Sequence, residues 1–426
     1  MTTYFIRRIL LIFPTFLGCT ILVFTILQIA PGGPLEQAIQ RLQGANQQAG
    51  GESASSSVSD IMDGGSQILP QKALDDLKRF YGFDKPIWMR YLIWLGIWER
   101  EIKHRDFIFE SGENELKKRV GKKDGKRVYL TIKKNNDKLF LYDNEGKLSK
   151  DWKGRFEKDD KEGVIFKTQY SGILTGNLGK SYIYQQQVTE VMAPRFKISL
   201  FFGLTGIILS YLVCVPLGIK KALNHGSVFD FSSSAMIFIA YSIPGWALGG
   251  VLLVIFGGGS FFDIFPLGGF RSPEEIWVNL TFTGKILDQL HHMILPLIAW
   301  NISSFATLTV LMKNSLLENL SQDYIRTAFA KGLSEKRVIW VHAIRNSLIP
   351  IASGIGGILG VVITGSYFIE RTFNIDGFGK LGFEAVLARD YPITLGFLVI
   401  VVAIRLVGNL ISDLALASVD PRIRFK

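Results

Sequence analysis

Long apolar stretches without charged residues dominate this chain. Six of them can be identified on a scale of about 20 residues, at 9–29, 198–219, 234–256, 293–312, 348–369 and 393–416. The first five contain no Asp, Glu, Lys or Arg, and each is long enough as a helix to cross ~30 Å of hydrocarbon. Because a backbone in lipid must satisfy its own hydrogen bonds, the stretches predict six transmembrane helices in an all-α polytopic membrane protein.

Basic residues in the short connecting segments indicate the orientation. With a cytoplasmic N-terminus, the inside segments carry 13 Lys and Arg residues, and the short outside loops carry five. This bias predicts that both termini face the cytoplasm. The first apolar stretch is too long for a signal-peptide core, so residues 1–30 are expected to remain as an uncleaved transmembrane helix.

The region between the first two apolar stretches divides by composition. Within the loop at 31–98, residues 44–66 are rich in Gly, Ser and Gln and predict a flexible tether. Residues 70–100 predict amphipathic helices with Trp and Tyr at the membrane surface. The charged insertion at 99–170 follows, and residues 171–426 carry the other five predicted spans.

The charged insertion predicts a small β-rich module outside the cytoplasm. Residues 99–167 contain 20 Lys and Arg and 15 Asp and Glu, and long domains translocate largely regardless of charge. The runs VYLTI at 128–132 and KLFLY at 138–142 alternate as strands around a turn. The charges are interpreted as a solvated surface, with docking of another protein as the alternative. The pI of 9.4 is therefore no argument for nucleic acid binding.

Motifs for catalysis or metal binding are missing from the sequence. The Gly-Lys-Ser at 179–181 lacks the Gly that a phosphate loop requires five positions earlier, where Leu174 stands. Cys19 and Cys214 both lie in predicted spans, and the His pair at 291–292 has no zinc-site spacing. No catalytic residue, metal ligand or cofactor is predicted, and the chain is not expected to be an enzyme.

A basic segment at 313–347 separates two of the apolar stretches and is predicted to lie in the cytoplasm. Small residues at Thr327, Ala328 and Ala330 leave a low-relief helix surface, and Gly332 is expected to end that helix. Such a helix fits a groove on a soluble partner, whereas the alternative is an ordinary solvated loop helix. The following stretch leads directly into the fifth apolar stretch, so a movement at Gly332 would reach that span.

Several motifs resemble one family of transporters. They are the segments at 28–34, 81–86, 176–181, 324–333, 345–350, 388–392 and 420–423. Together they resemble the inner-membrane permeases of binding-protein-dependent ABC importers of the peptide/nickel class, and most closely the YejB-type peptide permeases. The general importer pattern has Glu-Ala-Ala where this chain has Arg326, Thr327 and Ala328, a replacement typical of the peptide class. The insertion at 99–167 is not part of the family pattern.

The resemblance implies a type I importer fold that moves peptides, or nickel, by alternating access in the cell inner membrane. It implies a second, similar permease subunit, cytoplasmic ATPase subunits that bind ATP and Mg, and an extracytoplasmic binding protein. The ATPase contact would be formed by Asp323, Tyr324, Arg326, Thr327, Ala328, Ala330, Lys331 and Gly332. Arg345, Asn346 and Pro350 would form a lever into the fifth span.

Polar residues within the apolar stretches suggest two further features. Ser242, Pro244 and Asn301 are candidates for the translocation path between the two permeases. Arg405, Asn409 and Asp413 follow at i, i+4 and i+8 in the last stretch. Because ionisable groups in a span cost at least ~2.5 kcal/mol each unless they face protein or water, this stripe should face an interior. A structural Arg–Asp contact between helices is favoured over a substrate site.

Two other classes of protein are alternatives. An ATP-independent channel or secondary transporter would usually show internal repeats, and no convincing repeat is found in this sequence. A membrane-anchored receptor would use the charged module for binding and the spans only as an anchor. Membrane lipid is an expected partner in every case.

Overall fold

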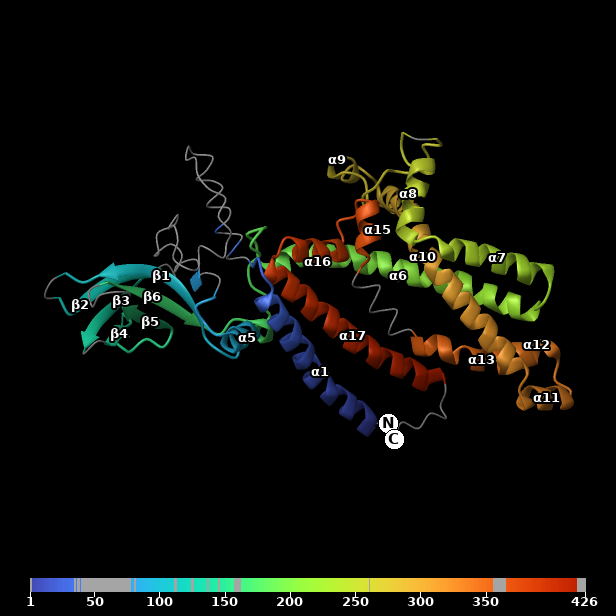
Figure 1. The fold of residues 1–426 in the computed structure, drawn as a ribbon, viewed down its shortest axis with the longest axis horizontal. Helices are drawn as coiled ribbons and strands as arrows, with labels where there is room; N and C mark the ends of the chain where they lie inside the picture. The colour runs from blue at the N-terminus through green and yellow to red at the C-terminus, as the bar shows by residue number, and fades with distance from the viewer. Residues whose placement is uncertain are drawn as a thin grey trace. The chain divides into compact units, whose positions relative to one another are not determined.

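The computed structural model describes the residues 2–33, 36, 39, 78–79, 82–110, 113–123, 126–135, 138–144, 146–156, 162–259, 261–354 and 365–419. The chain divides into two compact units (Figure 1). The helical unit comprises Met1–Val23 and Lys180–Lys426, and the β unit comprises Phe24–Gly179. The predicted tether at 44–66, residues 355–364 of the fifth apolar stretch and the motif at 420–423 lie outside the described residues.

Helices form nearly all of the regular structure in the helical unit. The long helices are α1 (Thr2–Ile29, which also enters the β unit), α6 (Val188–Leu223), α7 (Val228–Ser242), α8 (Gly245–Phe256), α10 (Phe282–Leu320) and α17 (Tyr391–Val419). The shorter ones are α9 (Glu274–Trp277), α11 (Asp323–Ala330), α12 (Glu335–Arg337), the π-helical η2 (Val338–Ala343), α13 (Ile344–Ser347), α15 (Tyr367–Thr372) and α16 (Phe378–Leu387).

Three described helices are long and apolar enough to cross a membrane, namely Ile6–Ile29, Val188–Leu223 and Tyr391–Leu414. Two bent pairs also qualify if each is one span: α7 with α8, bent by 94°, and the two parts of α10, bent by 53° near residue 303. The helical character of these apolar stretches is confirmed. The total of six spans stays a prediction, because residues 355–364 in the middle of the fifth stretch are not described.

Glycines on α8 let its backbone pack closely against α10. A Cβ added at Gly245 would lie 2.4 Å from the carbonyl oxygen of Ala299 in α10, and one at Gly249 would lie 3.4 Å from the Ala299 Cβ. Small residues at i and i+4 on one helix let two membrane helices approach closely. The glycines of α8 therefore fix how the second half of the bent pair rests on α10.

The described residues of the β unit include six antiparallel strands: β1 (Arg100–Ile108), β2 (Glu115–Lys123), β3 (Lys126–Asn135), β4 (Lys138–Tyr142), β5 (Trp152–Phe156) and β6 (Glu162–Gln169). They make two three-stranded sheets with the orders β1-β6-β5 and β2-β3-β4. Phe107, Leu130, Ile132, Leu141 and Ile165 belong to a shared buried core. Strands β3 and β4 contain the two runs in which strands are predicted.

A short aromatic helix precedes the strands of the β unit. This helix, α5 (Ile87–Leu95), lies within the predicted amphipathic stretch at 70–100 and ends at Gly96, whose φ is +89°. A Cβ added at Gly172 would lie 2.3 Å from the backbone nitrogen of Gly96, so only glycine permits this approach. Nearby, Glu99 accepts hydrogen bonds from Lys153 and Tyr170, and the Lys153 ammonium group lowers the pKa of Glu99.

Candidate coupling site

The predicted partner-binding segment forms a short helix with a defined end. Helix α11 carries Asp323 in its first turn, where a negative charge complements the helix dipole. Gly332 has a φ of +77° and donates to Phe329, while Leu333 donates to Ala328. These two backbone hydrogen bonds are those of a Schellman motif. The prediction that Gly332 ends the helix is confirmed.

One face of α11 is buried against its own chain. Ile325 and Ala328 are 2% and 7% exposed, and they belong to a cluster that we call the α11 core. Its buried members are Cys214, Ile219 and Ala222 of α6, Leu308, Met312 and Leu316 of α10, Ile325, Ala328, Val338, Ala343, Ile344 and Ile351. The prediction that places Ala328 on a partner-facing surface therefore needs correction. Its small side chain lets α11 lie close to α6 and α10.

The opposite face of α11 is accessible to a partner. It presents Asp323, Tyr324, Arg326, Thr327, Phe329 and Ala330, followed by Lys331 and Gly332. Phe329 is 46% exposed, but it was not among the residues predicted from the sequence to form the contact. Arg326 lies 3.6 Å from Asp323, a solvent-exposed pair that contributes little stability. The outward surface thus combines one aromatic ring with both signs of charge.

The segment after α11 is tied to α10 by two serines. The hydroxyl of Ser315 donates to the carbonyl oxygen of Ser347 at 3.0 Å, and the Ser347 hydroxyl lies 3.3 Å from the Ser315 carbonyl oxygen. Both serines are buried. All three predicted lever residues are exposed, namely Arg345, Asn346 and Pro350. Ser347, which stands inside the same motif, was not identified from the sequence.

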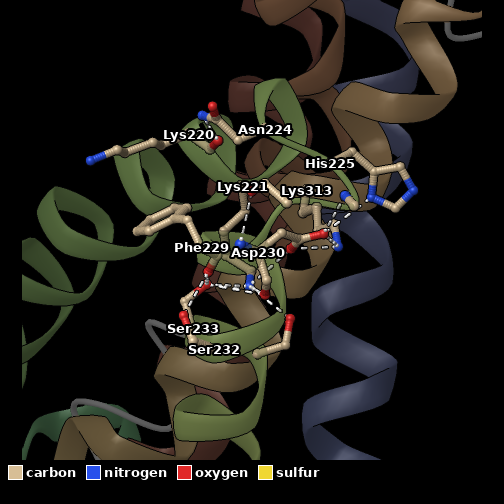
Figure 2. Close-up of polar contacts among 12 residues, drawn as sticks. Lys220, Lys221, Asn224, His225, Phe229, Asp230, Ser232, Ser233 and Lys313 are labelled. Atoms are coloured by element: carbon tan, nitrogen blue, oxygen red, sulfur yellow. Dashed lines mark hydrogen bonds and ion pairs between the residues drawn. The ribbon is translucent and has the colours of Figure 1, made fainter.

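Asp230, the third residue of α7, forms ion pairs with two lysines from different helices (Figure 2). Lys313 Nζ of α10 donates to both carboxylate oxygens of Asp230, at 2.8 and 2.7 Å. Lys221 Nζ of α6 lies 3.2 Å from the same carboxylate and donates to the Asp230 carbonyl oxygen at 2.9 Å. His225 Nδ1 also lies 3.2 Å from the carboxylate. A residue of α7 therefore joins three helices.

This network satisfies charges that are almost fully buried. The side chains of Lys221 and Asp230 are only 1% and 7% exposed. Lys221 Nζ completes its hydrogen bonds with the hydroxyls of Ser233 and Ser234, each at 2.7 Å. A buried charge is tolerated only when it is paired and hydrogen-bonded. Both lysines contribute to the basic bias that predicts the orientation, whereas Asp230 was not identified from the sequence.

The predicted path residues lie in different environments. Ser242 and Pro244 are exposed at the bend between α7 and α8, and the Ser242 hydroxyl donates to Phe238. Asn301 is 1% exposed, accepts from the Ser210 hydroxyl and donates to Leu297. It links α6 to α10 instead of lining a surface. An apolar hollow of about 630 Å³ lies beside the bend, and its lining includes Phe231, Ala235, Met236, Ile239, Ile243 and Leu248.

The polar stripe of the last helix is only partly covered within this chain. Asp413 forms an ion pair with Arg8, which joins α17 to α1. Arg405 and Asn409 are exposed. The favoured Arg–Asp contact between helices thus exists, with Arg8 as the partner of Asp413. The expectation that the whole stripe faces an interior does not hold for this single chain.

Two of the family-like motifs meet far from α11. Asp390 accepts hydrogen bonds from the Ser181 hydroxyl and from the backbone nitrogens of Tyr182 and Ile183. Both Ser181 and Asp390 are 1% exposed. The Gly-Lys-Ser sequence therefore ends in a buried structural contact before α17. Within the part of the chain that the structure describes, no group of three or more His, Cys, Asp or Glu residues could hold a metal ion.

Comparisons with known proteins agree with these motifs. Residues 214–425 match the family described as "Binding-protein-dependent transport system inner membrane component". The chain is 34% identical to the peptidoglycan transport system permease protein YejB of Agrobacterium fabrum over 427 residues, covering 100% of this chain and 99% of that protein. The inner membrane ABC transporter permease protein YejB of Escherichia coli O157:H7 is 34% identical over 441 residues, with both proteins covered fully.

A third relative is more distant. The dipeptide transport system permease protein DppB of Escherichia coli K12 is 27% identical over 441 residues, again with 100% of both chains covered. The relatives named here are permease proteins of transport systems, and the family match includes α11, the α11 core and Lys313. The chain therefore belongs to the family of inner membrane components of binding-protein-dependent transport systems.

Proposed function

We propose that this chain is the permease subunit of an ATP-driven importer that moves peptides or peptide-like compounds across the inner membrane. A peptide is the chemistry common to the dipeptide and peptidoglycan cargoes in the relatives' names. The single observation that carries the proposal is the geometry of α11. One face of α11 is buried in the α11 core, and the other is an exposed surface with an aromatic ring and charged residues. The whole helix lies within the region that matches the family.

In this proposal α11 binds a cytoplasmic ATPase, which alone holds ATP and Mg. Asp323, Tyr324, Arg326, Phe329 and Lys331 contact the ATPase, together with Thr327, Ala330 and Gly332, while Ala328 positions the helix. Because the Ser315–Ser347 contact joins α10 to α13, a displacement of α11 is passed to the fifth span through Arg345–Pro350. The spans then open alternately to the two sides of the membrane.

The remaining architecture follows from the same proposal. The permease core has six transmembrane helices, both termini lie in the cytoplasm, and the β unit lies outside. A second, similar permease subunit completes the path and covers the exposed Arg405 and Asn409 of α17. An extracytoplasmic binding protein delivers the cargo. The exposure of Arg405 and Asn409 on a largely apolar helix supports the need for a second subunit.

The test is reconstitution of the complex in vesicles with measurement of peptide uptake. Dipeptides, longer peptides and a peptidoglycan fragment are supplied as cargo. ATP is either present or absent on the side of the vesicle membrane that corresponds to the cytoplasm. We expect ATP-dependent uptake, together with co-purification of an ATPase. Uptake without ATP would instead indicate a channel or secondary transporter, and cargo binding without uptake would indicate a receptor.

A variant at the exposed ring tests the coupling contact itself. Phe329→Ser should abolish ATPase co-purification and uptake while leaving the amount of inserted protein unchanged, because the ring is half-exposed and outside the α11 core. Phe282→Ser is the matched control, since Phe282 is 79% exposed and lies at the first residue of α10, outside the segment that contains α11. Normal ATPase binding by Phe329→Ser would contradict the assigned contact.

A further inference from the structure

The attachment of α7 to the rest of the helical unit rests heavily on Asp230. Along α7 the apolar side chains Phe231, Met236 and Ile239 are 78%, 73% and 67% exposed, so they contribute little packing. In the first turn of α7, by contrast, Asp230 is buried. Its carboxylate contacts the side chains of Lys313, Lys221 and His225 and the backbone nitrogen of Gly226. The helix is thus anchored at one end by directional charge contacts (Figure 2).

The same turn of α10 serves both α11 and α7. Met312 and Leu316, on either side of Lys313, are completely buried in the α11 core together with Ile325 and Ala328. Lys313 itself bonds both oxygens of Asp230. Figure 1 places α11 and α12 at the end of the helical unit where α6 gives way to α7. A displacement of α11 therefore reaches Lys313 through direct side-chain packing.

From Asp230 a mechanical path continues to the bend. Helix α7 is a rigid element of 15 residues that ends at Ser242, directly before the break to α8. The two helices meet at 94°, and the apolar hollow lies beside that bend. A rotation imposed on the first turn of α7 is carried along the helix to this bend, because a helix transmits displacement with little bending over four turns.

We propose that Asp230 is a positioning residue that carries movement of α11, through Lys313, into α7 and its bend with α8. The residue acts without contacting cargo or ATP, and the inference rests on the proposed transport function. Its chemistry fits this task. Lys313 bonds both oxygens of the Asp230 carboxylate, and Lys221 links the same carboxylate to α6. These contacts constrain the distance and the rotation of α7 relative to α6 and α10, whereas apolar contacts alone do not.

The experiment compares variants in the complete transporter, assembled with its ATPase, second permease and binding protein in vesicles. Peptide uptake, ATP hydrolysis and the amount of assembled complex are measured together. In Asp230→Asn and Lys313→Gln we expect hydrolysis to continue while uptake per ATP falls by about tenfold, within the range typical of coupling between sites. Lys313→Arg keeps the charge pair and should retain most of the coupling.

Two comparisons separate a positioning role from a structural one. The double variant Asp230→Asn/Lys313→Gln should be no worse than either single variant, since both remove one contact. Asp376→Asn is the matched control. It removes another ion pair to α6, in which Arg195 Nε and Nη2 lie 3.1 and 3.0 Å from the Asp376 carboxylate oxygens. Because Asp376 is remote in sequence from α11, this variant should leave uptake per ATP unchanged.

Two results would overturn the inference. One is wild-type uptake per ATP in Asp230→Asn. The other is a parallel loss of uptake, hydrolysis and assembled complex in both Asp230→Asn and Lys313→Gln, which would show that the network only supports folding. Should Asp230→Asn fail to assemble, the contrast between Lys313→Arg and Lys313→Gln decides. Absence of ATP-driven uptake by the unchanged complex would refute the proposed function itself, and with it this inference.

Discussion

At the residue scale, burial assigns the role of each side chain in the coupling segment. Ala328 and Ala330 have the same side chain and lie two residues apart, but Ala328 is buried in the α11 core and Ala330 is exposed. The motif alone does not distinguish them. Asp230 illustrates the same point, because its importance comes from lysines that are 9 and 83 positions away in the sequence.

The two alanines give a matched pair of substitutions. Ala328→Leu inserts three carbons into a packed core and should destabilise the docking of α11 by about 1–3 kcal/mol, as overpacking usually does. Ala330→Leu should leave stability nearly unchanged and instead weaken ATPase binding, because Ala330 lies on the outward face. Thermal unfolding of the purified protein and ATPase co-purification measure the two effects. Equal unfolding temperatures for both variants would contradict the burial argument.

At the element scale, local signals identify where helices end, whereas contacts between helices determine their angles. Gly332 ends α11 as its position in the sequence predicts, because a left-handed φ there suits glycine. Pro244 similarly marks the break between α7 and α8. The bend of 94° depends in addition on how closely α8 approaches α10: Gly245 and Gly249 permit a close approach, but the sequence of α8 alone does not identify the helix that is approached.

Glycine substitutions in α8 test this approach. Gly245→Ala places a methyl group 2.4 Å from the backbone oxygen of Ala299, so the helices must separate, and we expect a loss of about 1–3 kcal/mol. Gly250→Ala, with no atom within 4 Å of its Cβ, should be neutral or stabilising, since alanine favours a helix by roughly 0.5–1 kcal/mol over glycine. Unfolding temperatures in detergent give the comparison, and a harmless Gly245→Ala would disprove the close contact.

At the scale of the whole molecule, the strands of the β unit share a core, and the start of β1 lies beside the end of β6. Arg100 and Gln169 are directly paired partners on β1 and β6, so their Cα atoms lie next to each other across one antiparallel ladder. The buried residues of the unit come from its own strands. The strands therefore form a module whose removal leaves only a short gap in the chain.

Excision of residues 101–168, with a short Gly-Ser bridge between Arg100 and Gln169, tests this modularity. We expect normal membrane insertion and ATPase co-purification, because the α11 core and the Asp230 network contain no residue of the β unit. The matched experiment is expression of residues 99–170 alone, which should give a folded β protein by circular dichroism. Aggregation of the excised permease would show that the helical unit depends on the insertion.

The sequence alone determined the class of the protein. Uncharged stretches of membrane-spanning length require helices in lipid, the charge bias of short loops predicts their orientation, and the motifs at 324–333 and 345–350 indicate a coupling segment. These features are local, so each can be identified from consecutive residues.

Tertiary structure decided which face of α11 is free, that Asp230 joins three helices, that Asn301 is internal and that Asp413 pairs with Arg8. Each of these depends on residues brought together from distant positions. Helical periodicity predicts that a face exists but does not identify the helix that covers it.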